Sequence, residues 1–162
     1  MKSETPLQVA AFLDTRPGHV KQTFGILDAL HRLTEIQIFQ VSLPHLPVQG
    51  EIMNWIKYFI TPTSNRFADL EGCDFMIGTG SRTHVPMLTC KKQYNIPAVT
   101  CMTPTPMLID TFDLCFVPQH DRVADAKNIF FTTGPPNRSQ SRENHDPNLG
   151  LILIGGKDEK SH

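Results

Sequence analysis

Apolar and polar positions alternate along the first part of the chain in two distinct patterns. An apolar run starts at Leu7 and is ended by Asp14. A turn follows up to His19, and after it apolar residues recur every three or four positions as far as Leu33. A short apolar run is typical of a buried strand, and the longer recurrence is typical of a helix. The stretch therefore predicts a strand, a turn and a helix, and the alternation over residues 35–41 predicts a second strand.

A second unit of this kind lies in the middle of the chain. Residues 74–77 predict a strand that runs into Gly78, and Thr83 is the expected cap of the next helix, with Pro86 in its first turn. Residues 97–102 predict the returning strand. A strand, helix and strand within about 30 residues indicate a right-handed crossover between parallel strands. Further strands are predicted at residues 113–117 and 128–132.

The helix predicted over residues 51–60 has two interpretations. Its apolar residues lie at helical spacing on one face, and they are Ile52, Trp55, Ile56 and Phe59. Such a face usually packs on a sheet, although it could also dock onto a membrane, a lipid acceptor or a protein partner. Exposure of Trp55 would separate the two.

The elements together predict an α/β fold, with a Rossmann-like, mainly parallel sheet and flanking helices over residues 1–133. Residues 134–148 are rich in proline and polar side chains, which predicts a linker. The apolar run 149–154 precedes Gly155 and Gly156, as at the start of another α/β unit. We therefore expect residues 149–162 to be the first strand and glycine turn of a truncated second domain.

Composition narrows the class of protein. The chain has 162 residues, 40% of them apolar, which suffices for one buried core. Fifteen basic and 16 acidic residues, with no basic run, argue against nucleic-acid binding. No secretory signal and no apolar stretch of transmembrane length is present, so we expect a cytoplasmic protein. The four widely spaced cysteines predict reduced core thiols, and the unpaired histidines predict no metal site.

His19 is the first candidate for chemistry. At the start of a helix the positive end of the helix dipole disfavours a protonated ring, so we expect a neutral imidazole able to act as a general base. It could instead cap the turn or bind a structural water. Asp14 could orient that ring or cap the helix, and Arg16 could hold a phosphate or carboxylate or simply be solvated.

The turn Gly78-Thr79-Gly80 offers a second candidate site. It follows a strand and opens a helix, so its N–H groups could cradle an anion or a sugar hydroxyl, or the glycines could serve only a tight turn. His84 and the pair His120-Asp121 lie at comparable strand ends and could line the same cleft, although an isolated histidine is more often a loop residue.

Other enzyme classes find little support. A nicotinamide-dependent epimerase needs a GxGxxG turn after the first strand, and this chain has only Gly18 there, beside Arg16 and Pro17. No GxxxxGK[ST] or GxSxG motif occurs, which argues against P-loop and serine-hydrolase chemistry.

Several short motifs occur in a fixed order along nearly the whole chain. They are Asp14-Thr15-Arg16-Pro17-Gly18-His19 with Gln22 and Gly25, residues 78–83, residues 112–114 and 117–121, residues 133–138, and residues 153–156. In these motifs the chain resembles the mitochondrial fission ELM-like family, whose bacterial members are catalogued as predicted nucleoside-diphosphate-sugar epimerases. The family is in turn similar to two-domain glycosyltransferases of the GT-B architecture.

That resemblance implies an acceptor-side domain with His19 as the base. It also implies a missing C-terminal domain that binds a nucleoside-diphosphate sugar, with Gly155 and Gly156 at the start of the turn that holds the diphosphate. The fragment itself would hold no cofactor and would be inactive. Small-molecule or lipid-linked acceptors and peripheral membrane contact are compatible with it, and a non-catalytic scaffold remains the alternative. The implied substrate-binding residues are Arg16, Gly18, Gly78, Thr79, Gly80, Ser81, Arg82, Thr83, His120 and Asp121.

Overall fold

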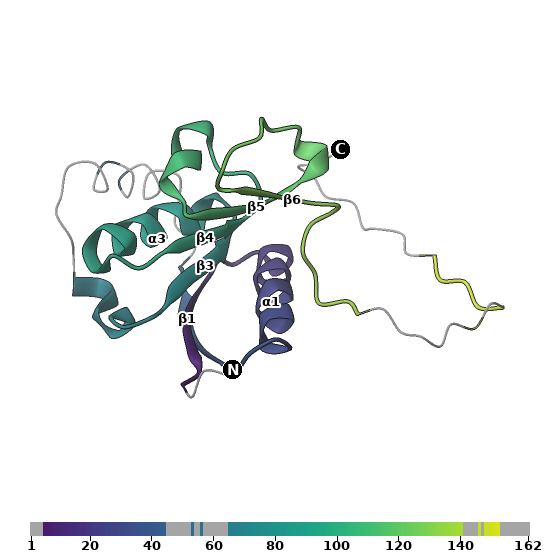
Figure 1. The fold of residues 1–162 in the computed structure, drawn as a ribbon, viewed down its shortest axis with the longest axis horizontal. Coiled ribbons are helices and arrows are strands. Elements are labelled where there is room, and N and C mark those ends of the chain that lie inside the picture. The colour runs from purple at the N-terminus through teal and green to yellow at the C-terminus, as the bar shows by residue number, and fades with distance from the viewer. Residues whose placement is uncertain are drawn as a thin grey trace.

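A single parallel sheet forms the centre of the molecule (Figure 1). The computed structural model describes residues 5–44, 53, 56, 65–140, 146 and 148–152. Among these residues the sheet has six strands in the order β2-β1-β3-β4-β5-β6, and every neighbouring pair is parallel. The strands are β1 (Leu7–Leu13), β2 (Ile36–Ser42), β3 (Phe75–Thr79), β4 (Ala98–Cys101), β5 (Leu114–Pro118) and β6 (Ile129–Thr132). The predicted Rossmann-like α/β fold is confirmed.

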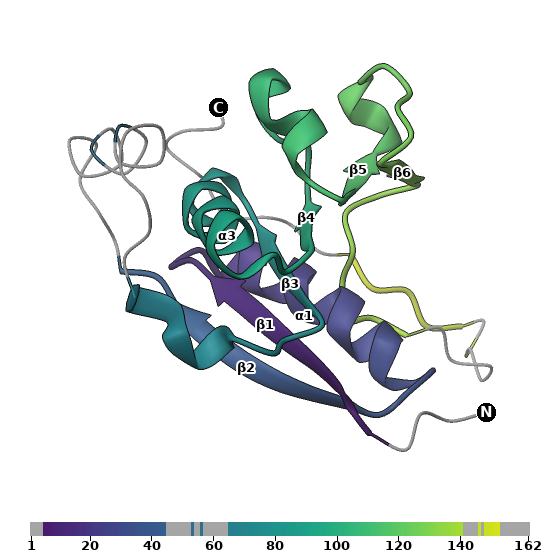
Figure 2. The ribbon, with the colours of Figure 1, turned by 60° about the vertical axis from the view of Figure 1, so that its left-hand side comes forward.

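Helices cover both faces of this sheet (Figures 1 and 2). Helix α1 (Pro17–His31) lies on one face and α3 (Ser81–Tyr94) on the other. Three short 3-10 helices complete the described elements, at Asn65–Leu70, Pro106–Thr111 and Gln119–Asp121. Both faces of the central strands are thus buried, which explains why these strands read as continuous apolar runs.

The two cores are divided by the alternation of side chains along each strand. In β1, Val9 and Ala11 pack toward α1 with Leu27, whereas Ala10 and Phe12 pack on the opposite side with residues of α3. These residues are all fully buried. The position of β1 between two other strands and two helices makes its C-terminal end a rigid support for the turn that follows.

Both long helices begin earlier than their sequence patterns indicate. Helix α1 starts at Pro17, so Gly18 and His19 lie in its first turn. Helix α3 starts at Ser81, and the prediction that Thr83 caps it is wrong. Gly80 is the N-cap at φ 89°, a conformation that lets the chain leave β3 and enter the helix without a longer turn. Pro86 consequently lies inside the helix and not in its first turn.

Three predictions fall wholly or partly outside the described residues. The helix expected at 51–60 is described only at Met53 and Ile56, which are helical and exposed, and Trp55 is not described. Leu149, Leu151 and Ile152 are 79–87% exposed and residues 149–152 form no strand, while Gly155 and Gly156 lie outside the described part. The second domain therefore stays a prediction.

The cysteines are confirmed as buried, unpaired thiols. Burial raises the pKa of Cys90 and of Cys101 to about 12, so neither is a thiolate at neutral pH. None of the helices described is both long and apolar enough to cross a membrane.

Candidate functional site

The candidate site lies where the chain changes direction across the sheet. From β1 the chain passes through α1 to β2 at one edge, whereas from β3 it passes through α3 to β4 on the other side. The C-terminal ends of β1 and β3 are neighbours at this point. Open α/β sheets bind ligands in the crevice outside such strand ends, because the two connections diverge there.

Asp14 and His19 form a hydrogen-bonded pair at the end of β1. Asp14 Oδ2 lies 2.6 Å from His19 Nδ1, and the two side chains are 1% and 14% exposed. The other carboxylate oxygen accepts the Arg16 N–H at 3.0 Å. An ionised carboxylate only accepts, so Nδ1 carries the proton and Nε2 of a neutral ring keeps its lone pair. Asp14 thus contacts both the His19 ring and the backbone at the start of α1.

Gly80 brings the second turn against this pair. A Cβ atom at position 80 would overlap Cε1 and Nδ1 of His19, so the imidazole packs directly on the backbone of the β3–α3 turn. The N-cap of α3 and the first turn of α1 are therefore in contact. The positive ends of both helix dipoles converge beside one imidazole, and neither first turn contains an acidic residue.

Most other residues of the second turn serve packing. Thr79 Oγ1 lies 2.8 Å from Thr23 Oγ1, and this buried pair ties α1 to the end of β3. The Thr83 hydroxyl donates to the Gly80 carbonyl at 2.8 Å. A Cβ on Gly78 would lie 2.8–2.9 Å from side chains of α3, so that glycine allows close contact of strand and helix. The Thr23 contact could not be predicted from local sequence, because its partner Thr79 is 56 positions away.

The residues exposed to solvent at this point come from two segments, the starts of α1 and α3. Arg16 is exposed at the start of α1, Gly18 has open space around its Cα, and Ser81 is exposed at the start of α3. Arg82 is partly buried, with Nη1 3.5 Å from the Thr15 hydroxyl. The structure thus brings together the first-turn residues of both helices around His19.

His120 and Asp121 lie at the same edge of the sheet but farther along it. They follow β5, which is three strands from β1, so about 14 Å separates the two positions at a strand spacing of about 4.8 Å. The Thr103 hydroxyl donates to Asp121 Oδ2 at 2.6 Å, and the His120 side chain is 67% exposed. No contact is recorded between this pair and the Asp14–His19 pair.

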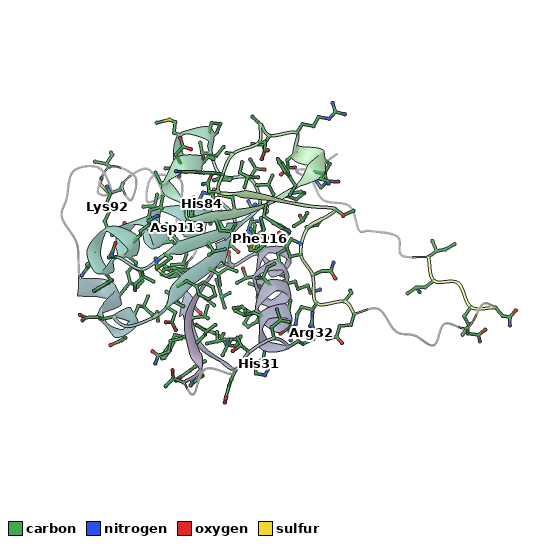
Figure 3. The ribbon with its side chains drawn as sticks, viewed as in Figure 1. His31, Arg32, His84, Lys92, Asp113 and Phe116 are labelled. Atoms are coloured by element: carbon green, nitrogen blue, oxygen red, sulfur yellow. The ribbon has the colours of Figure 1, made fainter. Side chains whose placement is uncertain are left out.

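His84, labelled in Figure 3, is buried, whereas the sequence suggested that it could line a cleft. Only 2% of it is exposed, its Nε2 lies 3.4 Å from Thr100 Oγ1, and its ring meets Phe112 edge-on at 5.1 Å. The early start of α3 places this residue on the side of the helix that faces the sheet. Burial, followed by the positive charge of a protonated His19, lowers the pKa of His84 to about 4.

This lowered pKa predicts acid-sensitive folding. The unfolded chain takes up a proton at His84 near its ordinary pKa of 6.5 and the folded chain only near 4, so stability is lost as pH falls through this window. The expected loss is at most about 3 kcal/mol. Urea unfolding at pH 7 and pH 4 measures it. His84→Leu should flatten the pH dependence, while His120→Leu should leave it unchanged; equal slopes in both variants would contradict the assignment.

The geometry defines the class of protein as a Rossmann-like α/β protein with a histidine–carboxylate pair at the switch point of its sheet. Comparison with family models then identifies the family: the model described as Mitochondrial fission ELM1 matches residues 17–162, and the chain belongs to that family. The match includes His19 and Gly80 and begins just after Asp14. Comparisons with curated proteins and with solved structures gave no match.

A metal centre finds no support among the residues described. No group of three or more histidine, cysteine or acidic side chains in that part of the chain is close enough to hold an ion.

Proposed function

We propose that this chain is the acceptor-binding lobe of a sugar-nucleotide-dependent glycosyltransferase of GT-B-like architecture. The observation that carries the proposal is His19, held by Asp14 at the switch point with Nε2 left to accept a proton. Support comes from the Rossmann-like sheet and from the resemblance of the family to two-domain transferases.

The proposed reaction uses His19 as the general base. Nε2 takes the proton of an acceptor hydroxyl while its oxygen forms a bond to the anomeric carbon of the donor sugar. The bond from that carbon to the diphosphate breaks, and its electron pair leaves with the nucleoside diphosphate. Asp14 stabilises the imidazolium that results, because its carboxylate already holds Nδ1–H.

The neighbouring groups suit an acceptor that carries negative charge. The exposed Arg16 and the partly buried Arg82 stand at the starts of α1 and α3, where the positive ends of both helix dipoles favour an anion. A phosphorylated small molecule or a lipid-linked phosphate would fit this chemistry. The donor, a nucleoside-diphosphate sugar, would be held by a second lobe that begins near residue 149, with Gly155 and Gly156 at its diphosphate.

A facing lobe is needed to exclude water from this site, so we expect no turnover by the 162-residue chain alone. Isothermal titration of this chain with uridine and guanosine diphosphate sugars should show no tight binding. A longer protein of the family should release nucleoside diphosphate only when an acceptor is present. Micromolar affinity of the chain alone for these sugars would contradict the proposal that the donor is bound by a second lobe. Formation of an epimerised sugar without release of nucleoside diphosphate would favour the epimerase.

A further inference from the structure

The Asp14–His19 pair leaves the imidazole with one nitrogen that can act as a nucleophile as well as a base. Asp14 Oδ2 holds His19 Nδ1 at 2.6 Å, so the lone pair of the neutral ring lies on Nε2. The carboxylate is itself fixed, because its second oxygen accepts the Arg16 N–H at 3.0 Å. A ring that a carboxylate holds in one tautomer can attack an electrophile through its other nitrogen without rearrangement.

The surroundings of His19 favour an electrophile that carries negative charge. The starts of α1 and α3 meet at its ring with the positive ends of their dipoles, and neither first turn contains an acidic residue. The Arg16 side chain is exposed at the start of α1, and a Cβ built on Gly18 meets no residue beyond its chain neighbours within 4 Å. A phosphoryl group, which is strongly negative, therefore has favourable charge and open space beside this histidine.

We propose that His19 accepts a phosphoryl group on Nε2 from a small acyl phosphate. The lone pair of Nε2 forms a bond to phosphorus, while the bond from phosphorus to the acyl oxygen breaks and its electron pair leaves with the carboxylate. No proton moves, because Nδ1 keeps its hydrogen and the Asp14 carboxylate stabilises the positive charge of the phosphorylated ring. An acyl phosphate suits this site, since its carboxylate leaves without protonation and neither first turn offers an acidic residue to protonate it.

This reaction goes beyond the proposed glycosyl transfer and needs no second lobe, because the groups that it uses belong to the 162-residue chain. A phosphoryl group on Nε2 would occupy the lone pair that takes the proton of the acceptor hydroxyl. Phosphorylation would therefore switch off the general base, and this consequence rests on the proposed function. The phosphorylation itself does not depend on it.

Acetyl phosphate is the probe, and His31 is the matched comparison within the same helix. His31 lies exposed in the last turn of α1, at the negative end of the dipole, whereas the His19 side chain is only 14% exposed. Access to solvent alone would therefore favour labelling of His31. We expect tandem mass spectrometry to locate the phosphoryl group on His19, with a rate about tenfold above that of His31.

The control variant His31→Ala should leave the labelling of His19 unchanged. Labelling of His31 as fast as that of His19, or no labelling of His19, would overturn the proposal. Neither result would decide whether His19 is a general base, because nitrogen-15 spectra of the ring test that assignment separately.

Two substitutions separate an oriented nucleophile from a histidine that is merely accessible. Asp14→Asn moves the ring proton to Nε2 and should slow the labelling of His19 about tenfold or more. Should Asp14→Asn fail to fold, Arg16→Gln removes an exposed charge and should slow the labelling about threefold. Lys127→Gln is the control for Arg16→Gln, because this exposed cation precedes β6, at the end of the sheet opposite to His19. Wild-type rates in Asp14→Asn or in Arg16→Gln would also overturn the proposal.

Discussion

Replacing Gly80 with alanine is expected to lower the free energy of unfolding by about 4 kcal/mol. Position 80 has φ 89° and ψ 156°, a region that is open essentially to glycine alone and costs other residues about 1–3 kcal/mol. The added Cβ would also overlap the His19 ring, and overpacking of this kind costs about 1–3 kcal/mol more. Urea unfolding monitored by circular dichroism measures the loss.

Gly72→Ala separates the two contributions. Gly72 has a similar backbone angle, φ 96°, but no atom lies within 4 Å of a Cβ built there. Its substitution should therefore cost only the backbone strain of about 1–3 kcal/mol. The observation that Gly80→Ala and Gly72→Ala destabilise equally would show that His19 does not pack on the β3–α3 turn.

Asp14→Asn is expected to reduce the proposed glycosyl transfer by about 10³–10⁴-fold in a longer protein of the family. The Arg16 N–H can only donate, so the amide oxygen of an asparagine must face it and the amide N–H group must face His19 Nδ1. Nδ1 then becomes an acceptor, the ring proton moves to Nε2, and the base is blocked. The reverse orientation would set two donors against each other.

Nitrogen-15 spectra of the imidazole provide a direct readout in the chain itself. The Nε2 of His19 should lack a proton in the neutral wild-type ring and carry one in Asp14→Asn. His31→Ala is the control for activity, since that side chain is exposed in the last turn of α1, at the opposite end of the helix from His19. Transfer within tenfold of wild type by Asp14→Asn would remove the assignment of His19 as an oriented base.

The strands could be predicted closely because the information for them is local. Each is a short apolar run, or in β2 an alternation of apolar and polar residues, bounded by turn-forming or polar residues. The predicted and observed limits differ by at most two residues, as for β2 at 36–42 against 35–41. The Asp14–His19 contact is also nearly local, because five positions across a strand-to-helix turn bring the side chains together. The start of α3 could not be predicted as closely. A glycine such as Gly80 can adopt several backbone conformations, so the sequence does not determine at which residue the helix begins.

Sequence alone thus determined the parallel α/β elements, the buried reduced thiols and the identity of the residues at the strand ends. Only the tertiary structure decided that Gly80 contacts the His19 ring, that His84 is buried, and that Asn137 and Arg138 of the predicted linker contact α1. Periodicity along the chain reports which side of an element faces a core. It does not report which other element fills that core, because that depends on close packing between residues far apart in the sequence, such as Gly80 and His19 or Arg138 and Asp28.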